Sequence, residues 1–236
     1  MNSSRNVGRF ARYTALIMEL GVGSLAMNPE AMAEEKIVVK VGKPLQAAQE
    51  LAQKKDLNGA LAKVREAEQV PSKTPFEQFK IDQFKVLIQL LRGDYASART
   101  AMEATLASGF LPAEEVTKTH KSLAQIAYQL KDYDKVIDHG KKYLQSAPGD
   151  LEFQLLMIQS QYLQKDFRAT ATGMRSVIAA ADRSGKEVKQ EWLQLLMSAE
   201  YEQKNTAGVA DSLEMLLKRY PSQKYWRDRI QMVQDL

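Results

Sequence analysis

The chain has 236 residues, of which 44% are hydrophobic, and it contains no cysteine. That apolar fraction is enough for a core and excludes a disordered chain, while the lack of cysteine excludes disulfides, thiolate nucleophiles and cysteine-ligated metals. The 33 Lys and Arg residues are mixed evenly with 29 Asp and Glu residues, for a net charge of +4. A nucleic-acid binder usually gathers its basic residues in one stripe, so we expect no nucleic-acid partner.

Residues 1–33 have the layout of a secretory signal peptide. Three arginines precede an apolar stretch over residues 13–27, and the small residues Ala31 and Ala33 follow it. This order predicts cleavage after Ala33 and a periplasmic location, and the apolar stretch is too short to span a membrane. The mature chain is therefore expected to have no membrane span. Because Glu19 interrupts the apolar stretch and the segment is rich in Arg and poor in acid, a mitochondrial or a cytoplasmic location is the alternative.

A motif recurs through the rest of the chain. Each copy has an Asp or Asn, followed after four residues by a small or β-branched residue and after eight and eleven residues mainly by larger apolar ones. Spacings of four, four and three keep these positions on one face of a helix, so each Asp or Asn predicts a turn between two helices. The five turn residues, 34 to 39 positions apart, are Asp56, Asp94, Asp132, Asp166 and Asn205.

Proline and capping residues mark the ends of these units. Thr74, Pro75 and Glu77 form the pattern of an N-cap, a first-turn proline and a capping-box acid. We expect inserts at 75–78, 113–116 and 185–189, and a final helix that caps the last apolar face with Tyr225, Trp226, Ile230 and Val233. The predicted repeats are 41–74, 79–112, 117–150, 151–184 and 190–223, with the cap at 224–236.

The best copy of the motif carries Leu123, Ala124, Tyr128, Asp132 and Pro148. With these residues the chain resembles the tetratricopeptide repeat (TPR) family, which repeats a 34-residue helix-turn-helix. The resemblance implies an all-α fold: a right-handed superhelical solenoid of about five TPR-like helix pairs plus a C-terminal capping helix. It also implies that 34–236 is a single domain.

Nothing in the sequence predicts catalysis. His120 and His139 are the only histidines, and neither has a partner at metal-ligand spacing, so we expect two partly exposed helix residues. A Gly-rich phosphate loop, a nucleophile motif and a zinc motif are all missing from the sequence. We therefore expect no enzyme activity, no metal and no cofactor.

In the TPR family the inner faces of the first helices line a concave groove. The resemblance implies that the concave face carries Lys118, Lys121, Gln125, Tyr128, Leu155, Gln159, Tyr162, Gln194, Ser198 and Tyr201. Tyr and Gln side chains suit the recognition of an extended peptide. The alternative is that the tyrosine rings only pack between neighbouring helices. Family members that clamp a peptide carboxylate use Lys and Asn here, whereas this chain has Gln125 and Gln159.

The sequence thus predicts a protein–protein interaction scaffold that binds a peptide or a partner protein on its concave face, in the bacterial envelope. Two alternatives remain open. The protein could be a structural subunit of an envelope complex that uses its convex or edge surfaces, or a non-catalytic subunit of an enzyme complex. The oligomeric state is left open.

Overall fold

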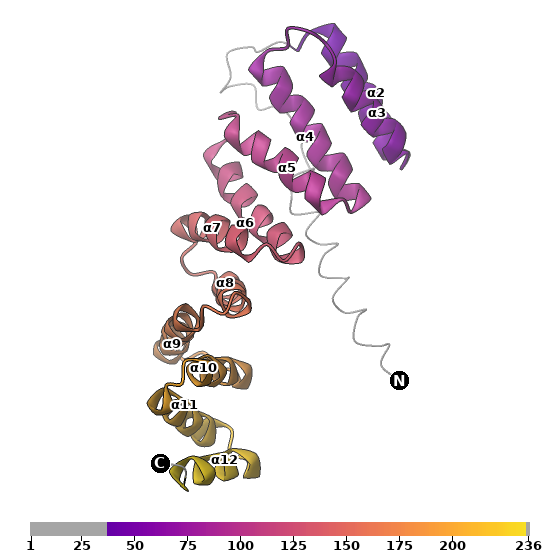
Figure 1. Cartoon of the computed structure of the whole chain (residues 1–236). Helices are drawn as coiled ribbons and strands as arrows, with labels where there is room; N and C mark the ends of the chain where they lie inside the picture. Colours follow the sequence, from indigo (N-terminus) through magenta and orange to yellow (C-terminus); the bar gives the residue numbers. More distant parts are fainter. Residues whose placement is uncertain (1–36, 235–236) are drawn as a thin grey trace, which may run out of the picture. The chain divides into compact units, whose positions relative to one another are not determined.

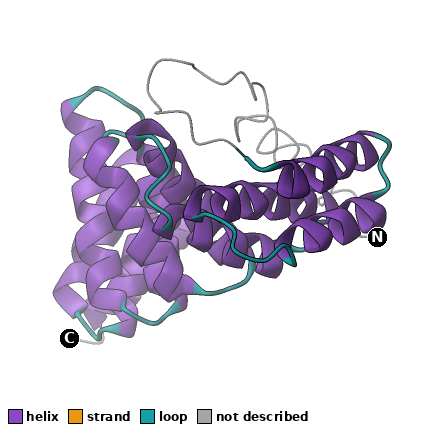
Figure 2. Cartoon of the chain, turned by 90° about the horizontal axis from the view of Figure 1, so that it is seen from above, coloured by secondary structure: helices purple, strands orange, loops and turns teal. Residues whose placement is uncertain are grey.

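The computed structural model describes residues 37–234, and this part of the chain contains helices and loops without any strand (Figure 2). The all-α expectation is confirmed. The predicted signal peptide lies outside the described residues, and no described helix is both long and apolar enough to cross a bilayer. The helices are α2 (Val39–Gln53), α3 (Leu57–Glu68), α4 (Pro75–Arg92), α5 (Tyr95–Ala107), α6 (Ala113–Gln129), α7 (Tyr133–Ser146), α8 (Leu151–Leu163), α9 (Phe167–Arg183), α10 (Gln190–Glu202), α11 (Thr206–Arg219) and α12 (Gln223–Gln234).

These helices fall into two compact units that meet in sequence between Leu130 and Lys131. In the first unit α2 packs on α3 and α4 on α5, and α6 follows (Figure 1). In the second unit α7 packs on α8, α8 on α9, α9 on α10, α10 on α11 and α11 on α12. The predicted repeat 117–150 therefore places its first helix in one unit and its second helix in the other. The superhelical path and the single domain over 34–236 stay predictions.

One turn geometry joins the two helices of every predicted repeat. The turn Asp or Asn accepts a hydrogen bond from the backbone N–H three residues later, as in Asp56 with Gly59 (2.9 Å) and Asp166 with Ala169 (3.0 Å). The residue before it has left-handed backbone, a conformation that glycine adopts without strain. The five φ angles are 62° at Lys55, 73° at Gly93, 60° at Lys131, 65° at Lys165 and 58° at Lys204. The predicted turns are confirmed.

Four of the five residues that stand four positions after a turn lie in the core, as expected. Ala60, Ala98, Val136 and Thr170 are fully buried, whereas Val209 is half-buried. Side chains without bulk at these positions let the two helices of a pair approach closely, and the larger residues further along fill the remaining space. The positions eight and eleven after the turns are buried in every repeat: Val64, Met102, Gly140, Met174, Leu213, Ala67, Thr105, Tyr143, Val177 and Leu216.

The residues 75–78 and 113–116, expected as inserts between repeats, are helical and form the first turns of α4 and α6. The cause in α4 is the Thr74 capping box. The Thr74 hydroxyl accepts from Glu77 N (3.1 Å), and the Glu77 carboxylate accepts from Thr74 N (2.9 Å) and also from Val38 N at the start of α2 (2.7 Å). Burial opposes the charge of Glu77, but these backbone and hydroxyl donors outweigh it and lower its pKa. The insert 185–189 is a loop.

Two further expectations about burial are corrected. His139, expected to be partly exposed, is 4% exposed, because it lies between Val136 and Gly140 on the inner face of α7. In the capping helix Tyr225 is buried, but Trp226 and Ile230 are more than half exposed. The Tyr225 hydroxyl receives hydrogen bonds from Gln190 (2.8 Å) and Gln194 (2.7 Å), and this anchor turns the next residue of α12 outward. The Val233 side chain lies outside the described set.

Candidate functional site

Two adjoining grooves run along the second unit between α8, α10 and α12. Residues 155, 159 and 162 are spaced by four and three, which places them on one face of α8, and residues 194, 198 and 201 repeat this spacing on α10. One groove, of about 870 Å³, lies against α10, α11 and α12, and the other, of about 700 Å³, lies between α8 and α10. Both are lined by Tyr162 and Ser198, so the two grooves adjoin at these residues.

We call the first depression the tyrosine groove. Its apolar lining comes from Met197, Val209 and Leu213, and Tyr162 and Tyr201 stand along it. The Tyr201 side chain is 72% exposed, so its ring covers little of the protein. The Tyr162 ring instead packs edge-on against Phe167, with the centroids 5.4 Å apart. The two tyrosines thus differ: the Tyr162 ring is part of the packing, and the Tyr201 ring is exposed to solvent.

The second depression, the glutamine groove, is lined by Leu155, Gln159, Gln194 and Ser198 among others. Gln159 is exposed, so its amide can both donate and accept hydrogen bonds. The Gln194 amide nitrogen already donates a hydrogen bond to the Tyr225 hydroxyl. The ammonium group of Lys189 lies 6.0 Å from the centre of the Trp192 ring.

The charged side chains along the two grooves are mainly acidic. Glu202 and Asp228 line the tyrosine groove, and Glu152 and Glu191 line the glutamine groove. Lys204 and Lys189 are the basic side chains there. None of the four carboxylates forms an ion pair with any residue in the described range 37–234. Their charges therefore lie along the grooves without an ion pair to another described residue.

Six of the ten predicted site residues thus lie together in the second unit. The other four, Lys118, Lys121, Gln125 and Tyr128, are on α6 in the first unit and do not line these grooves. Lys118 is ion-paired with Glu114 (2.8 Å) and Glu115 (3.1 Å) of its own helix. Hydrogen bonds to these two carboxylates raise the pKa of Lys118.

Sequence reasoning missed the contribution of α12, which supplies Asp228 and Gln231 to the tyrosine groove. The repeat pattern assigns the lining of the groove to the first helix of each repeat and gives α12 only the role of a cap. The repeat pattern itself indicates this contribution. A helix that follows the last repeat occupies the position of the first helix of a further repeat, and first helices line the groove. Within residues 37–234 no group of three His, Asp or Glu side chains could hold a metal ion.

No protein-family model matches the chain, and no curated protein matches it in sequence. Among solved structures, the chain is similar to YrrB, described as a TPR protein with an unusual peptide-binding site, at a TM-score of 0.48 and 12% identity over 77% of this chain and 87% of that one. MamA from Desulfovibrio magneticus RS-1 aligns at a TM-score of 0.45 and 13% identity, over 80% and 99% of the two chains. Pseudomonas aeruginosa PilF aligns at 0.36 and 12%, over 80% and 96%.

The helix pairs of this chain are TPR-like, as the resemblance implied. This description rests on the helices of the chain itself. They form pairs joined by capped turns, and four of the five residues that stand four positions after a turn are buried.

Proposed function

We propose that this protein is a protein–protein interaction scaffold whose second unit binds an extended peptide segment of a partner in the tyrosine and glutamine grooves. The observation that carries the proposal is the Tyr201 ring, 72% exposed beside an apolar lining in a depression of about 870 Å³. Tyrosine is enriched among the residues that dominate binding energies, because it offers a large, rigid surface with a polar tip.

The continuity of the two grooves supports a peptide rather than a compact small molecule. The glutamine groove is open to solvent along α8 and α10, the tyrosine groove continues along α10, α11 and α12, and the two share Tyr162 and Ser198. An extended peptide has unpaired backbone N–H and C=O groups at regular intervals, and the exposed Gln159 amide and the Ser198 hydroxyl can pair with them. Apolar side chains of the peptide would then cover Met197 and Val209.

Tyr201 and Trp226 provide a matched test, since both are exposed aromatics of the second unit and only Tyr201 lines a groove. A photo-reactive phenylalanine at position 201 should crosslink a partner from an envelope extract. Tyr201→Ala should weaken binding of that partner by about 2 kcal/mol, roughly 30-fold, if the ring is an anchor. Because the ring covers little of the protein, the melting curve should stay unchanged. Full binding by folded Tyr201→Ala would contradict the proposal.

A second candidate surface is the outer face of α12, where Trp226 and Ile230 are 55% and 57% exposed. This observation favours the alternative of a structural subunit that docks through its edge. If Trp226→Ala loses the partner and Tyr201→Ala keeps it, the edge is the binding surface.

We also propose that the protein acts in the bacterial envelope, which the predicted signal peptide supports. Intact-mass analysis of the protein purified from its own cells should show a chain that begins at Glu34. Retention of Met1 or Asn2 would contradict both the cleavage and the periplasmic location.

A further inference from the structure

We infer that the peptide bound by the tyrosine groove is cationic, with Lys or Arg next to a large apolar or aromatic side chain. This inference rests on the proposed function and adds the chemical class of the partner. It follows from the charge of the grooves and from the side chains that surround that charge.

The charge of the grooves is opposite to that of the whole chain. The sequence carries a net charge of +4, yet the two grooves present four carboxylates and two ammonium groups. Glu202, Glu152 and Glu191 are exposed and Asp228 is half-buried. Since none of them has an ion-pair partner among residues 37–234, a cationic partner would gain their attraction without breaking an existing ion pair.

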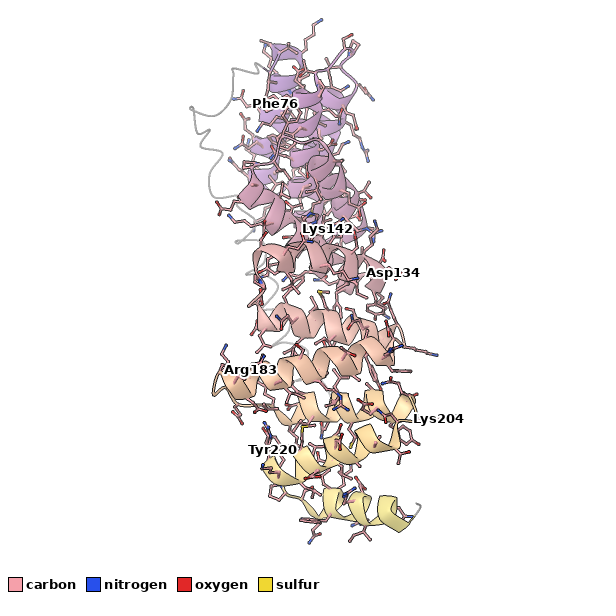
Figure 3. The ribbon with its side chains drawn as sticks, turned by 90° about the vertical axis from the view of Figure 1, so that its left-hand side faces the viewer. Phe76, Asp134, Lys142, Arg183, Lys204 and Tyr220 are labelled. Carbon is pink, nitrogen blue, oxygen red and sulfur yellow. The ribbon has the colours of Figure 1, made fainter. Side chains whose placement is uncertain are left out.

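The position of Lys204 leaves the acidic character of the tyrosine groove intact. Lys204 is the left-handed residue of the turn between α10 and α11, and Figure 3 shows it at one edge of the second unit, opposite Arg183 and Tyr220. Lys204 is the single basic residue among those that line the tyrosine groove, beside Glu202 and Asp228. Asp228 belongs to α12, which forms another wall of the groove, so the carboxylates are not confined to the turn that carries Lys204.

The aromatic and apolar lining fits the same class of peptide. An exposed tyrosine ring attracts a guanidinium or ammonium group to its face, and this attraction adds to that of a nearby carboxylate. Met197 and Val209 offer apolar surface to a neighbouring side chain of the peptide. An acidic peptide would meet four like charges along the depression, which favours the cationic alternative.

The effect of the carboxylates should be modest and sensitive to salt. An exposed ion pair changes affinity by up to about fivefold, so reversing two carboxylates should weaken binding about tenfold or more at low salt. At 0.15 M salt, charges further apart than about 8 Å are largely screened, and the loss should shrink at higher salt. Binding to the aromatic and apolar lining should persist under these conditions.

The test uses a randomised library of ten-residue peptides displayed on phage and selected on the purified full chain. We expect enrichment of Lys or Arg beside aromatic or aliphatic residues. The best peptide is then synthesised with a fluorescent label, and its affinity is measured by anisotropy for two double variants. Glu202→Lys with Asp228→Lys should weaken binding of the peptide about tenfold. Asp211→Lys with Glu214→Lys should weaken it by no more than about twofold. The second pair is the matched control, since both residues are exposed on α11 and line neither groove.

The outcomes separate this inference from the proposed function. Neutral or acidic peptides that lose affinity with Tyr201→Ala would overturn the cationic class and keep the groove. Cationic peptides that respond equally to both double variants would also overturn the inference, because only the net charge of the protein would then matter. Peptides unaffected by Tyr201→Ala, or a selection that enriches no peptide, would overturn both.

Discussion

Replacing Gly208 by Ala should destabilise the second unit, although the same change in most helices is stabilising. Gly208 is buried in the first turn of α11. A Cβ atom there would lie 2.4 Å from Oε2 of Glu200 and 2.7 Å from Nδ2 of Asn205. In a helix, alanine is ordinarily better than glycine by about 1 kcal/mol, which is the gain that the clash must exceed.

The Glu200 carboxylate cannot easily move aside. Glu200 is 3% exposed, and its carboxylate accepts hydrogen bonds from Nη2 of Arg175 (2.7 Å) and Nδ2 of Asn205 (2.6 Å). Asn205 also caps α11, with its side-chain oxygen accepting from Gly208 N (3.2 Å). Losing one hydrogen bond to a charged group costs about 1.5–3 kcal/mol, and weakening the cap costs about 1 kcal/mol. After the gain of about 1 kcal/mol from alanine, the net destabilisation should therefore be about 1.5–3 kcal/mol.

Urea unfolding followed by circular dichroism measures this difference. Gly42→Ala is the matched control, because a Cβ atom at Gly42 would meet only Cγ2 of Ile37, at an ordinary 3.6 Å. That control should stabilise the protein by about 0.5–1 kcal/mol. In a Glu200→Ala background, which removes the carboxylate, Gly208→Ala should destabilise the protein less, because only the contact with Nδ2 of Asn205 remains. A Gly208→Ala protein as stable as the parent, or an equal cost in both backgrounds, would refute the reasoning.

Two further predictions concern the turns and the joint between α2 and α4. Lys165 has a φ of 65°, so Lys165→Gly should relieve left-handed strain and stabilise the protein by about 0.5–1 kcal/mol in the same urea assay; a loss of stability would contradict this. The pKa of Glu77 is lowered below its ordinary 4.5, so its charge contributes stability that is present above pH 4.5 and is lost as the pH falls through the lowered pKa. Glu77→Gln should flatten this part of the stability profile, and an unchanged profile would show that Glu77 does not contribute to it.

The site was only partly predictable. The face of α8 and the face of α10 followed from helical spacing, and six predicted residues lie in the grooves. Spacing could not tell that the Tyr162 ring packs on Phe167 while Tyr201 stays exposed, because that difference depends on neighbours in other helices. Nor could it place Asp228 in the tyrosine groove, since this required the packing of α12.

The sequence by itself determined the helices and their turns. The reason is that these depend on neighbours within one or two helical turns: Asp132 caps the helix that begins at the next residue, and Ala98 lies on the same face as Met102. The tertiary structure decided which side chains of separate helices meet. Glu77 binds Val38, 39 positions away, and the Tyr225 hydroxyl sets the rotation of α12 through glutamines more than 30 positions away. Such contacts form only when separate helices pack together, so no local pattern in the sequence encodes them.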